Sequence, residues 1–138
     1  MVLHYALLAA QVLIGPAAPQ ARAPEPFCRT DGVQQLRIYE IFDGNKAAFH
    51  ARFRDHAARI MKRYGFEVIR MWETRHSGRT EFVYLLQWPS EAVMKDRWTA
   101  FLADEEWSRI KRETAAAHGQ LVGEIEERTL TRTDYSPC

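Results

Sequence analysis

The sequence predicts an α+β domain in which a four-stranded antiparallel sheet carries helices on one face. Two observations predict this class. Short alternating stretches rich in isoleucine, valine and aromatic residues are typical of strands, and longer stretches place apolar residues at helical spacing. Along the chain these stretches follow the order strand, helix, strand, strand, helix, strand. A length of 138 residues suits one such domain.

The first strand and the first helix follow one another directly. "LRIYEIF" at 36–42 is the strand, and "DGN" ends it with residues that favour turns. Asp43 or Asn45 is expected to cap the helix at 46–64 through its side-chain oxygen. The apolar stripe of this helix recurs every third or fourth position and consists of Phe49, Phe53, Ala57, Ile60 and Tyr64.

A hairpin follows the first helix. Its strands are 66–75 and 80–88, and "HSG" forms the turn between them. Ser90 is expected to cap a second helix at about 91–103. This helix is expected to bury Val93, Met94, Trp98, Phe101 and Leu102.

A short third helix and a last strand complete the domain. Asp104 is expected to cap that helix, whose apolar side holds Trp107 and Ile110. The last strand is 121–132. The complete order is the ferredoxin-like βαββαβ arrangement, with helices on one face of the sheet.

The predicted strands are apolar on both faces. In the third strand, Tyr84 and Trp88 alternate onto one face, and Val83 and Leu85 onto the other. Helices cover only one face, so the second face needs another cover. We expect an obligate homodimer whose sheets meet. The alternative is a monomer whose outer face is partly covered by the helix at 104–118 and by the tails.

The N-terminal residues 1–23 are expected to be a signal peptide that directs export to the periplasm or the medium. An apolar run at 5–15 is too short to span a membrane and precedes the A-x-A pattern "ARA" at 21–23. No Lys or Arg precedes the run, and cleavage would leave Pro24 first, so a disordered leader on a cytoplasmic protein is the alternative.

The remaining boundaries follow from composition. Residues 24–35 are interpreted as a linker, residues 36–133 as the domain, and residues 134–138 as a C-terminal tail. The sequence has 19 basic and 18 acidic residues and no basic stripe, so no nucleic-acid partner is expected.

Four stretches carry a resemblance to a known family: "LRIYEIFDGNKAAFHARF", "YGFEVIRMWET", "FVYLLQWPSEAVMKDRW" and "FLADEEWSRIK". With the closing "YSP", they resemble the NIPSNAP family of the dimeric α+β barrel superfamily from about residue 36 to residue 137. The resemblance implies the same sheet-to-sheet dimer. The superfamily also contains small oxygenases, some cofactor-free and some acting on haem, whose pocket lies between the helices and the sheet.

Cys28 and Cys138 precede the first strand and follow the last one. Because these strands are antiparallel neighbours in this fold, both tails leave the same edge. In an exported protein the two cysteines could form a disulfide that closes a very long loop. Two free thiols in a reducing compartment are the alternative. Two separated cysteines do not indicate a metal site.

Aromatic and basic residues on the strands are candidates for a cavity that would bind a small aromatic or anionic ligand. His56, beside the apolar stripe of the first helix, could act as a base or a haem ligand, or simply bond a carbonyl at the core boundary. The candidates are Arg37, Tyr39, His56, Arg70, Trp72, Tyr84 and Trp88.

No catalytic, metal or cofactor motif is identified, such as a phosphate loop, a nucleophile elbow or paired carboxylates. The sequence therefore favours a dimeric module that binds a small apolar or aromatic ligand or a protein partner, without defined catalysis. The alternative is a small monooxygenase of the superfamily, either cofactor-free or haem-dependent.

Overall fold

The computed structural model describes Gly15 and residues 31–137. Apart from Gly15, the expected signal peptide lies outside the described residues. So do Cys28 and Cys138 of the expected disulfide. Among the described residues, no helix is long and apolar enough to cross a membrane.

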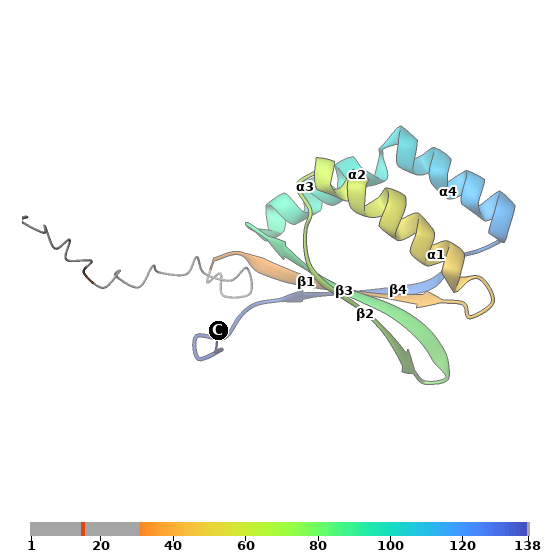
Figure 1. The fold of residues 1–138 in the computed structure, drawn as a ribbon. Helices are drawn as coiled ribbons and strands as arrows, with labels where there is room; N and C mark the ends of the chain where they lie inside the picture. The colour runs from red at the N-terminus through yellow and green to blue at the C-terminus, as the bar shows by residue number, and fades with distance from the viewer. Residues whose placement is uncertain (1–14, 16–30, 138) are drawn as a thin grey trace, which may run out of the picture.

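The predicted order of elements is confirmed (Figure 1). The sheet has the strand order β2-β3-β1-β4, and every neighbouring pair is antiparallel. The elements are β1 (Val33–Ile41), α1 (Lys46–Arg52), the π-helical segment η2 (Phe53–Ala57), α2 (Ala58–Arg63), β2 (Glu67–His76), β3 (Arg79–Trp88), α3 (Glu91–Leu102), α4 (Glu105–His118) and β4 (Val122–Leu130).

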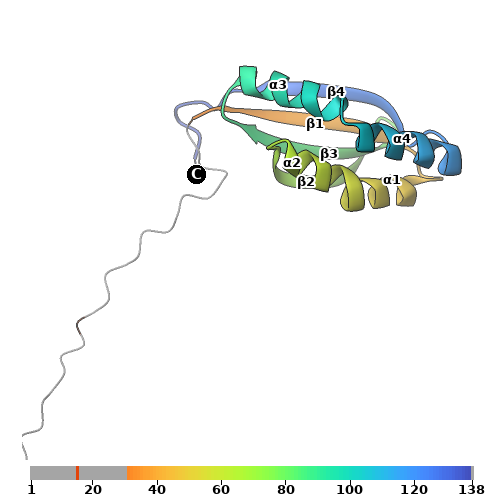
Figure 2. The ribbon, with the colours of Figure 1, turned by 90° about the horizontal axis from the view of Figure 1, so that it is seen from above.

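The helices form one layer on one face of the sheet (Figure 1). Seen from above, α1 and α2 run along one side of this layer, and α3 and α4 along the other (Figure 2). The third helix, α4, was expected to be short, yet its 14 residues make it longer than the 12 residues of α3. The run of three alanines before His118 extends this helix toward its C-terminus, because alanine is the best helix former.

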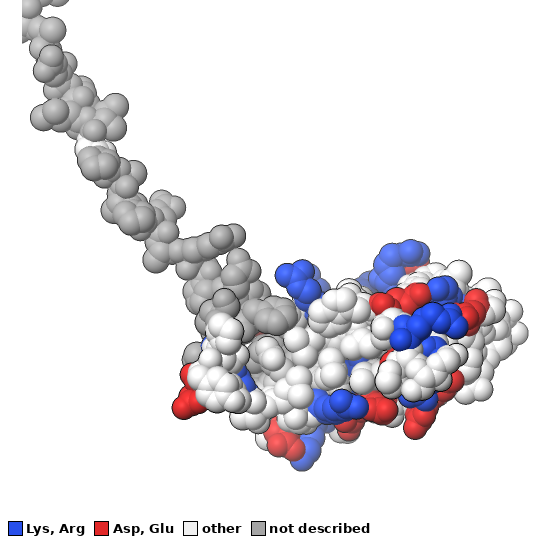
Figure 3. Space-filling view, turned by 90° about the horizontal axis from the view of Figure 1, so that it is seen from below, with Lys and Arg blue, Asp and Glu red and all other residues white. Residues whose placement is uncertain are grey.

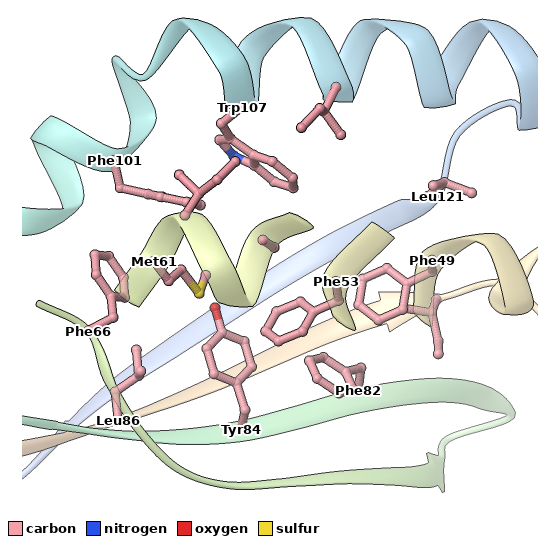
Figure 4. Packing of buried hydrophobic residues seen from close by; sticks show 14 of the residues in the cluster. Phe49, Phe53, Met61, Phe66, Phe82, Tyr84, Leu86, Phe101, Trp107 and Leu121 are labelled. Atoms are coloured by element: carbon pink, nitrogen blue, oxygen red, sulfur yellow. The ribbon is translucent and has the colours of Figure 1, made fainter. Parts of the chain in front are cut away.

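Aromatic rings occupy much of the space between the helix layer and the sheet (Figure 4). Trp88 and Tyr84 of β3 are completely buried. Phe101 of α3 and Trp107 of α4 stack with ring centroids 5.4 Å apart and join the two helices. Each large apolar side chain buried in this way contributes about 1.5–3 kcal/mol to folding. The core therefore holds the helix layer on the sheet.

Local capping follows the sequence at two of the three expected places. The side-chain oxygen of Ser90 accepts from the N–H of Val93 at 3.1 Å, and that of Asp104 accepts from the N–H of Trp107 at 2.8 Å. Neither Asp43 nor Asn45 caps α1 through its side chain.

The side chains of Asp43 and Asn45 connect other segments instead. Asp43 accepts hydrogen bonds from Arg75 and Thr80. The amide of Asn45 donates to the backbone carbonyls of His118 and Gln120. Both residues therefore link the start of α1 to distant parts of the chain.

The apolar side of α3 is narrower than predicted. Met94 and Phe101 are buried, and Val93 and Trp98 are partly buried. Leu102, which was expected to be buried, is 55% exposed. It is the last residue of α3, where the chain turns toward α4.

The outer face, which we define as the sheet face away from the helices, carries apolar residues from three strands. Ile38 of β1 and Trp72 of β2 both pair with Val83 of β3. Because Val83 is next to the buried Tyr84, this row points away from the helices. Trp72 is 44% exposed. Figure 3 looks onto this face and shows uncharged surface between groups of charged side chains.

Candidate functional site

A cavity of about 190 Å³ lies between the helix layer and the sheet. Its wall is mostly apolar, which is typical of sites for small organic ligands. The apolar lining comes from every helical segment and from β4, and consists of Phe49, Phe53, Ala57, Met61, Trp98, Phe101, Leu102, Trp107, Val122 and Ile125.

The π-helical segment η2 helps to form this wall. It contributes Phe53 and Ala57, both buried and both lining the cavity. A π-helical turn inserts an extra residue into the helix and is frequent at functional sites. The helix pattern of the sequence did not reveal this turn, because Phe53 and Ala57 also fit a regular apolar stripe.

Arg37 and Tyr39 of β1 form the polar part of the cavity wall on the sheet side. The Nη2 of Arg37 donates to the hydroxyl of Tyr39 at 3.3 Å, and its guanidinium carbon lies 4.3 Å from the ring centroid of Trp98. Arg37 also forms an ion pair with Glu127 of β4. Burial disfavours its charge, but Tyr39, Tyr84 and Glu127 outweigh this and raise the pKa of Arg37.

Two more cations line the cavity from the helices. Arg52 of α1 donates from Nη1 to the hydroxyl of Thr114 at 3.1 Å. Its guanidinium carbon lies 5.5 Å from the ring centroid of Trp107, and the Nζ of Lys111 lies 5.7 Å from the same ring. Burial lowers the pKa of Arg52.

Exposed apolar side chains mark the open side of the cavity. Leu102 at the end of α3 and Ile125 of β4 both line it, although they are 55% and 49% exposed. The cavity is therefore open to solvent between α3 and β4. The incomplete burial of Leu102, which the sequence did not predict, follows from this position.

The structure brings four of the seven candidate residues to the helix face of the sheet. Arg37 and Tyr39 line the cavity. Tyr84 lies beside them, with its hydroxyl 2.7 Å from that of Tyr39, and burial raises its pKa well above the usual range. Trp88 is buried on the same face and donates from Nε1 to the side chain of Gln35, but it does not line the cavity.

The other three candidates lie away from the cavity. Arg70 and Trp72 are exposed on the outer face, because a β-bulge between Val68 and Arg70 inserts Ile69. The extra residue reverses the alternation, so that Arg70 and Trp72 no longer share the face of Val68. His56 of η2 is partly buried and is not among the lining residues.

The sequence analysis did not identify Arg52, Lys111 and Trp107 as lining residues. One signal was present, because Trp107 and Lys111 are four residues apart and so share a face of α4. Within residues 31–137, no group of three or more His, Cys, Asp or Glu side chains is placed to hold a metal ion.

Comparison with solved structures shows a shared fold. A NIPSNAP family protein from Agrobacterium tumefaciens strain C58 is 20% identical with a TM-score of 0.65, over 76% of this chain and 96% of that one. An uncharacterised NIPSNAP-like domain protein from Burkholderia xenovorans is 19% identical with a TM-score of 0.64, over 77% of this chain and 89% of that one.

A more distant neighbour is a monooxygenase from the gene ActVA-Orf6 of Streptomyces coelicolor, solved in complex with nanaomycin D. It is 14% identical with a TM-score of 0.50, over 79% of this chain and 95% of that one, which is a likeness of fold alone. No curated protein matches the sequence. The profile of the NIPSNAP family matches residues 34–137, most of the chain. This chain therefore belongs to the NIPSNAP family.

Proposed function

We propose that this protein is a homodimeric module that binds a small, largely apolar ligand in the cavity between its helices and its sheet. The observation that carries the proposal is the cavity itself. A space of about 190 Å³ with apolar walls and one open side remains in an otherwise packed core. Protein interiors are normally close-packed, so such a space is suited to a ligand smaller than a typical drug.

Binding is favoured over catalysis by the groups that line the cavity. Tyrosine, arginine and lysine are the only polar types among its described lining residues. These groups orient and hold a ligand, whereas a general base is most often a histidine or a carboxylate. The proposed function therefore contains no catalytic step, and a monooxygenase remains the alternative to be tested.

The apolar surface of the outer face supports the homodimer. The row formed by Ile38, Val83 and Trp72 is apolar and lies on the sheet face opposite the described helices. In a homodimer, this row on one copy would pack against the same row on the second copy, as a twofold interface requires. A protein partner other than a second copy is the alternative occupant of this face.

Two measurements test the proposal. Native mass spectrometry of the purified protein should show a dimer, and any retained ligand should appear as added mass. Isothermal titration with 2-naphthamide, a small neutral aromatic probe, should show saturable binding. The variant Ile125→Trp should weaken that binding because it fills the open side of the cavity, and Ala117→Trp on the exposed surface of α4 should not.

The possible outcomes separate the parts of the proposal. A monomer would overturn the sheet-to-sheet dimer. Absence of binding by both neutral and anionic aromatic probes would overturn the ligand-binding function. Bound mass that matches haem, or oxidation of a bound aromatic compound by oxygen, would favour the monooxygenase alternative.

A further inference from the structure

The charged groups on the cavity wall have one sign. All three charged residues that line the cavity, Arg37, Arg52 and Lys111, are cations. Arg37 is neutralised by Glu127. Within residues 31–137, neither Arg52 nor Lys111 forms an ion pair with a carboxylate. The helix side of the cavity therefore carries positive charge that no described side chain balances.

The two unbalanced cations converge on one aromatic ring. Arg52 comes from α1 and Lys111 from α4, yet their charged groups lie 5.5 Å and 5.7 Å from the ring centroid of Trp107. Contact with an aromatic face stabilises a cation, but it does not neutralise the charge. Two like charges at one ring also repel each other.

The donors of Arg52 are only partly used. A guanidinium has five N–H donors, and the described hydrogen bond of Arg52 is the one to Thr114. Burial lowers the pKa of Arg52, which shows that the site disfavours a charge without a counterion. An anion placed beside this guanidinium would take up free donors and remove that penalty.

We propose that the ligand of this cavity is a small aromatic acid whose carboxylate is held by Arg52 and Lys111. The inference rests on the proposed function and adds the charge of the ligand to it. The apolar wall around Phe101 and Trp107 takes the aromatic part, and the two cations at Trp107 take the carboxylate. The cavity would therefore recognise a ligand that has an apolar body and one anionic end.

A second role for these cations is packing. The aliphatic parts of arginine and lysine can cover a buried aromatic ring while their charged ends face water. In that case their replacement would lower stability and would leave the preference among ligands unchanged. The two roles therefore predict different results for matched charged and neutral probes.

Isothermal titration with 2-naphthoate and 2-naphthamide tests the inference, because the two probes share shape and differ in charge. The wild-type protein should bind the acid about tenfold more tightly than the amide or better. Arg52→Gln and Lys111→Gln should each remove most of this difference, because the affinity for the acid falls more than the affinity for the amide does. Arg112→Gln removes the same charge from an exposed position on α4 and should change neither affinity.

Each outcome has one meaning. Equal affinity for acid and amide would overturn the preference for an anion while the ligand-binding function stands. A lower unfolding midpoint in Arg52→Gln and Lys111→Gln, with the tenfold difference kept, would assign both residues to packing and overturn the inference. Binding of neither probe would overturn the proposed function as well.

Discussion

The hydroxyl groups of Tyr39 and Tyr84 lie 2.7 Å apart, although the two residues are not opposite each other in the sheet. Tyr39 pairs with Phe82, and Tyr84 pairs with Arg37, so the contact is diagonal across β1 and β3. Tyr84 is completely buried, and a buried hydroxyl needs a hydrogen-bond partner. Tyr39 supplies that partner and thereby connects the core to the cavity wall.

Tyr84 should make the protein sensitive to alkali. Its pKa is raised well above the usual range, chiefly by burial, so the unfolded chain loses the phenolic proton at a lower pH than the folded protein does. Above a pH of about 10, ionisation therefore favours the unfolded state, and the free energy of unfolding falls as the pH rises. The variant Tyr84→Phe should lose less of this free energy than the wild type does.

Urea unfolding at pH values of about 8 and about 10.5 measures the effect, because these values lie on either side of the ordinary tyrosine pKa. Tyr135→Phe is the control, since Tyr135 is 83% exposed and its variant should keep the wild-type pH dependence. Equal loss of stability in Tyr84→Phe and the wild type would contradict the prediction.

Glu106 of α4 should make the protein sensitive to acid. Hydrogen bonds from Arg59 and Arg63 of α2 lower the pKa of Glu106 from 4.5 to about 2. The stabilisation is complete above the pKa of the unfolded chain and is lost as the pH falls from about 4.5 toward about 2. Because the group is partly exposed to solvent, the effect should be small and should weaken with salt.

A comparison of Glu106→Gln with Glu105→Gln measures this contribution. Glu105 is the exposed neighbour on the same helix turn, and within the described residues it has no ion pair. The urea midpoint should decrease less between neutral pH and a pH of about 3 in Glu106→Gln than in the wild type, because the variant lacks the carboxylate whose pKa is lowered. If Glu105→Gln reduces the pH dependence of the urea midpoint equally, the ion pairs of Glu106 with Arg59 and Arg63 are not the cause.

Trp107 should contribute strongly to stability. It is only 8% exposed and stacks on Phe101, so its removal would delete the ring contact between α4 and α3. Trp107→Ala should lower the free energy of unfolding by about 3–5 kcal/mol, as deletions of buried aromatic side chains do. Leu102→Ala is the control, and at 55% exposure it should cost much less. Similar urea midpoints in the two variants would contradict the buried role of Trp107.

The order of elements could be predicted because its signals are local. Ser90 and Asp104 each precede a helix and accept a hydrogen bond from the N–H three residues later, as their residue types suggest. Strand alternation and helix periodicity likewise depend on neighbouring residues alone. These signals are sufficient for the βαββαβ order and for the hairpin of β2 and β3.

The two faces of β2 could not be predicted, because one residue decides them. Without the bulge at Ile69, Arg70 and Trp72 would lie on the face of Val68. Nothing in the run from Val68 to Trp72 distinguishes a bulge from regular alternation. Arg70 and Trp72 lie on the outer face because of the register in which β2 pairs with β3, and this register cannot be read from the sequence.

The composition of the cavity was only half predictable for a related reason. Arg37 and Tyr39 alternate on one strand, so their shared face is visible in the sequence. Arg52 and Lys111 lie on different helices, and both reach the ring of Trp107 only because α1 and α4 are neighbours. Helix periodicity shows which face is apolar, but it does not show which helices are neighbours.

The outer face provides the last prediction, which concerns the proposed dimer. Val83 lies at the centre of this face, paired with Ile38 on one side and Trp72 on the other. Val83→Lys would place a positive charge at the centre of the interface. There it would face the same positive charge of the second copy, which is unfavourable. Analytical ultracentrifugation should therefore show a dimer for the wild type and a monomer for Val83→Lys.

The matched control is Ala117→Lys, which adds the same charge to an exposed position on α4. It should remain dimeric, because α4 lies on the opposite side of the sheet from the outer face (Figure 1). Circular dichroism must show that Val83→Lys keeps its helices, since an unfolded chain would also lose the dimer. A folded Val83→Lys that remains dimeric would place the interface elsewhere, and the row of Ile38, Val83 and Trp72 would then need another partner.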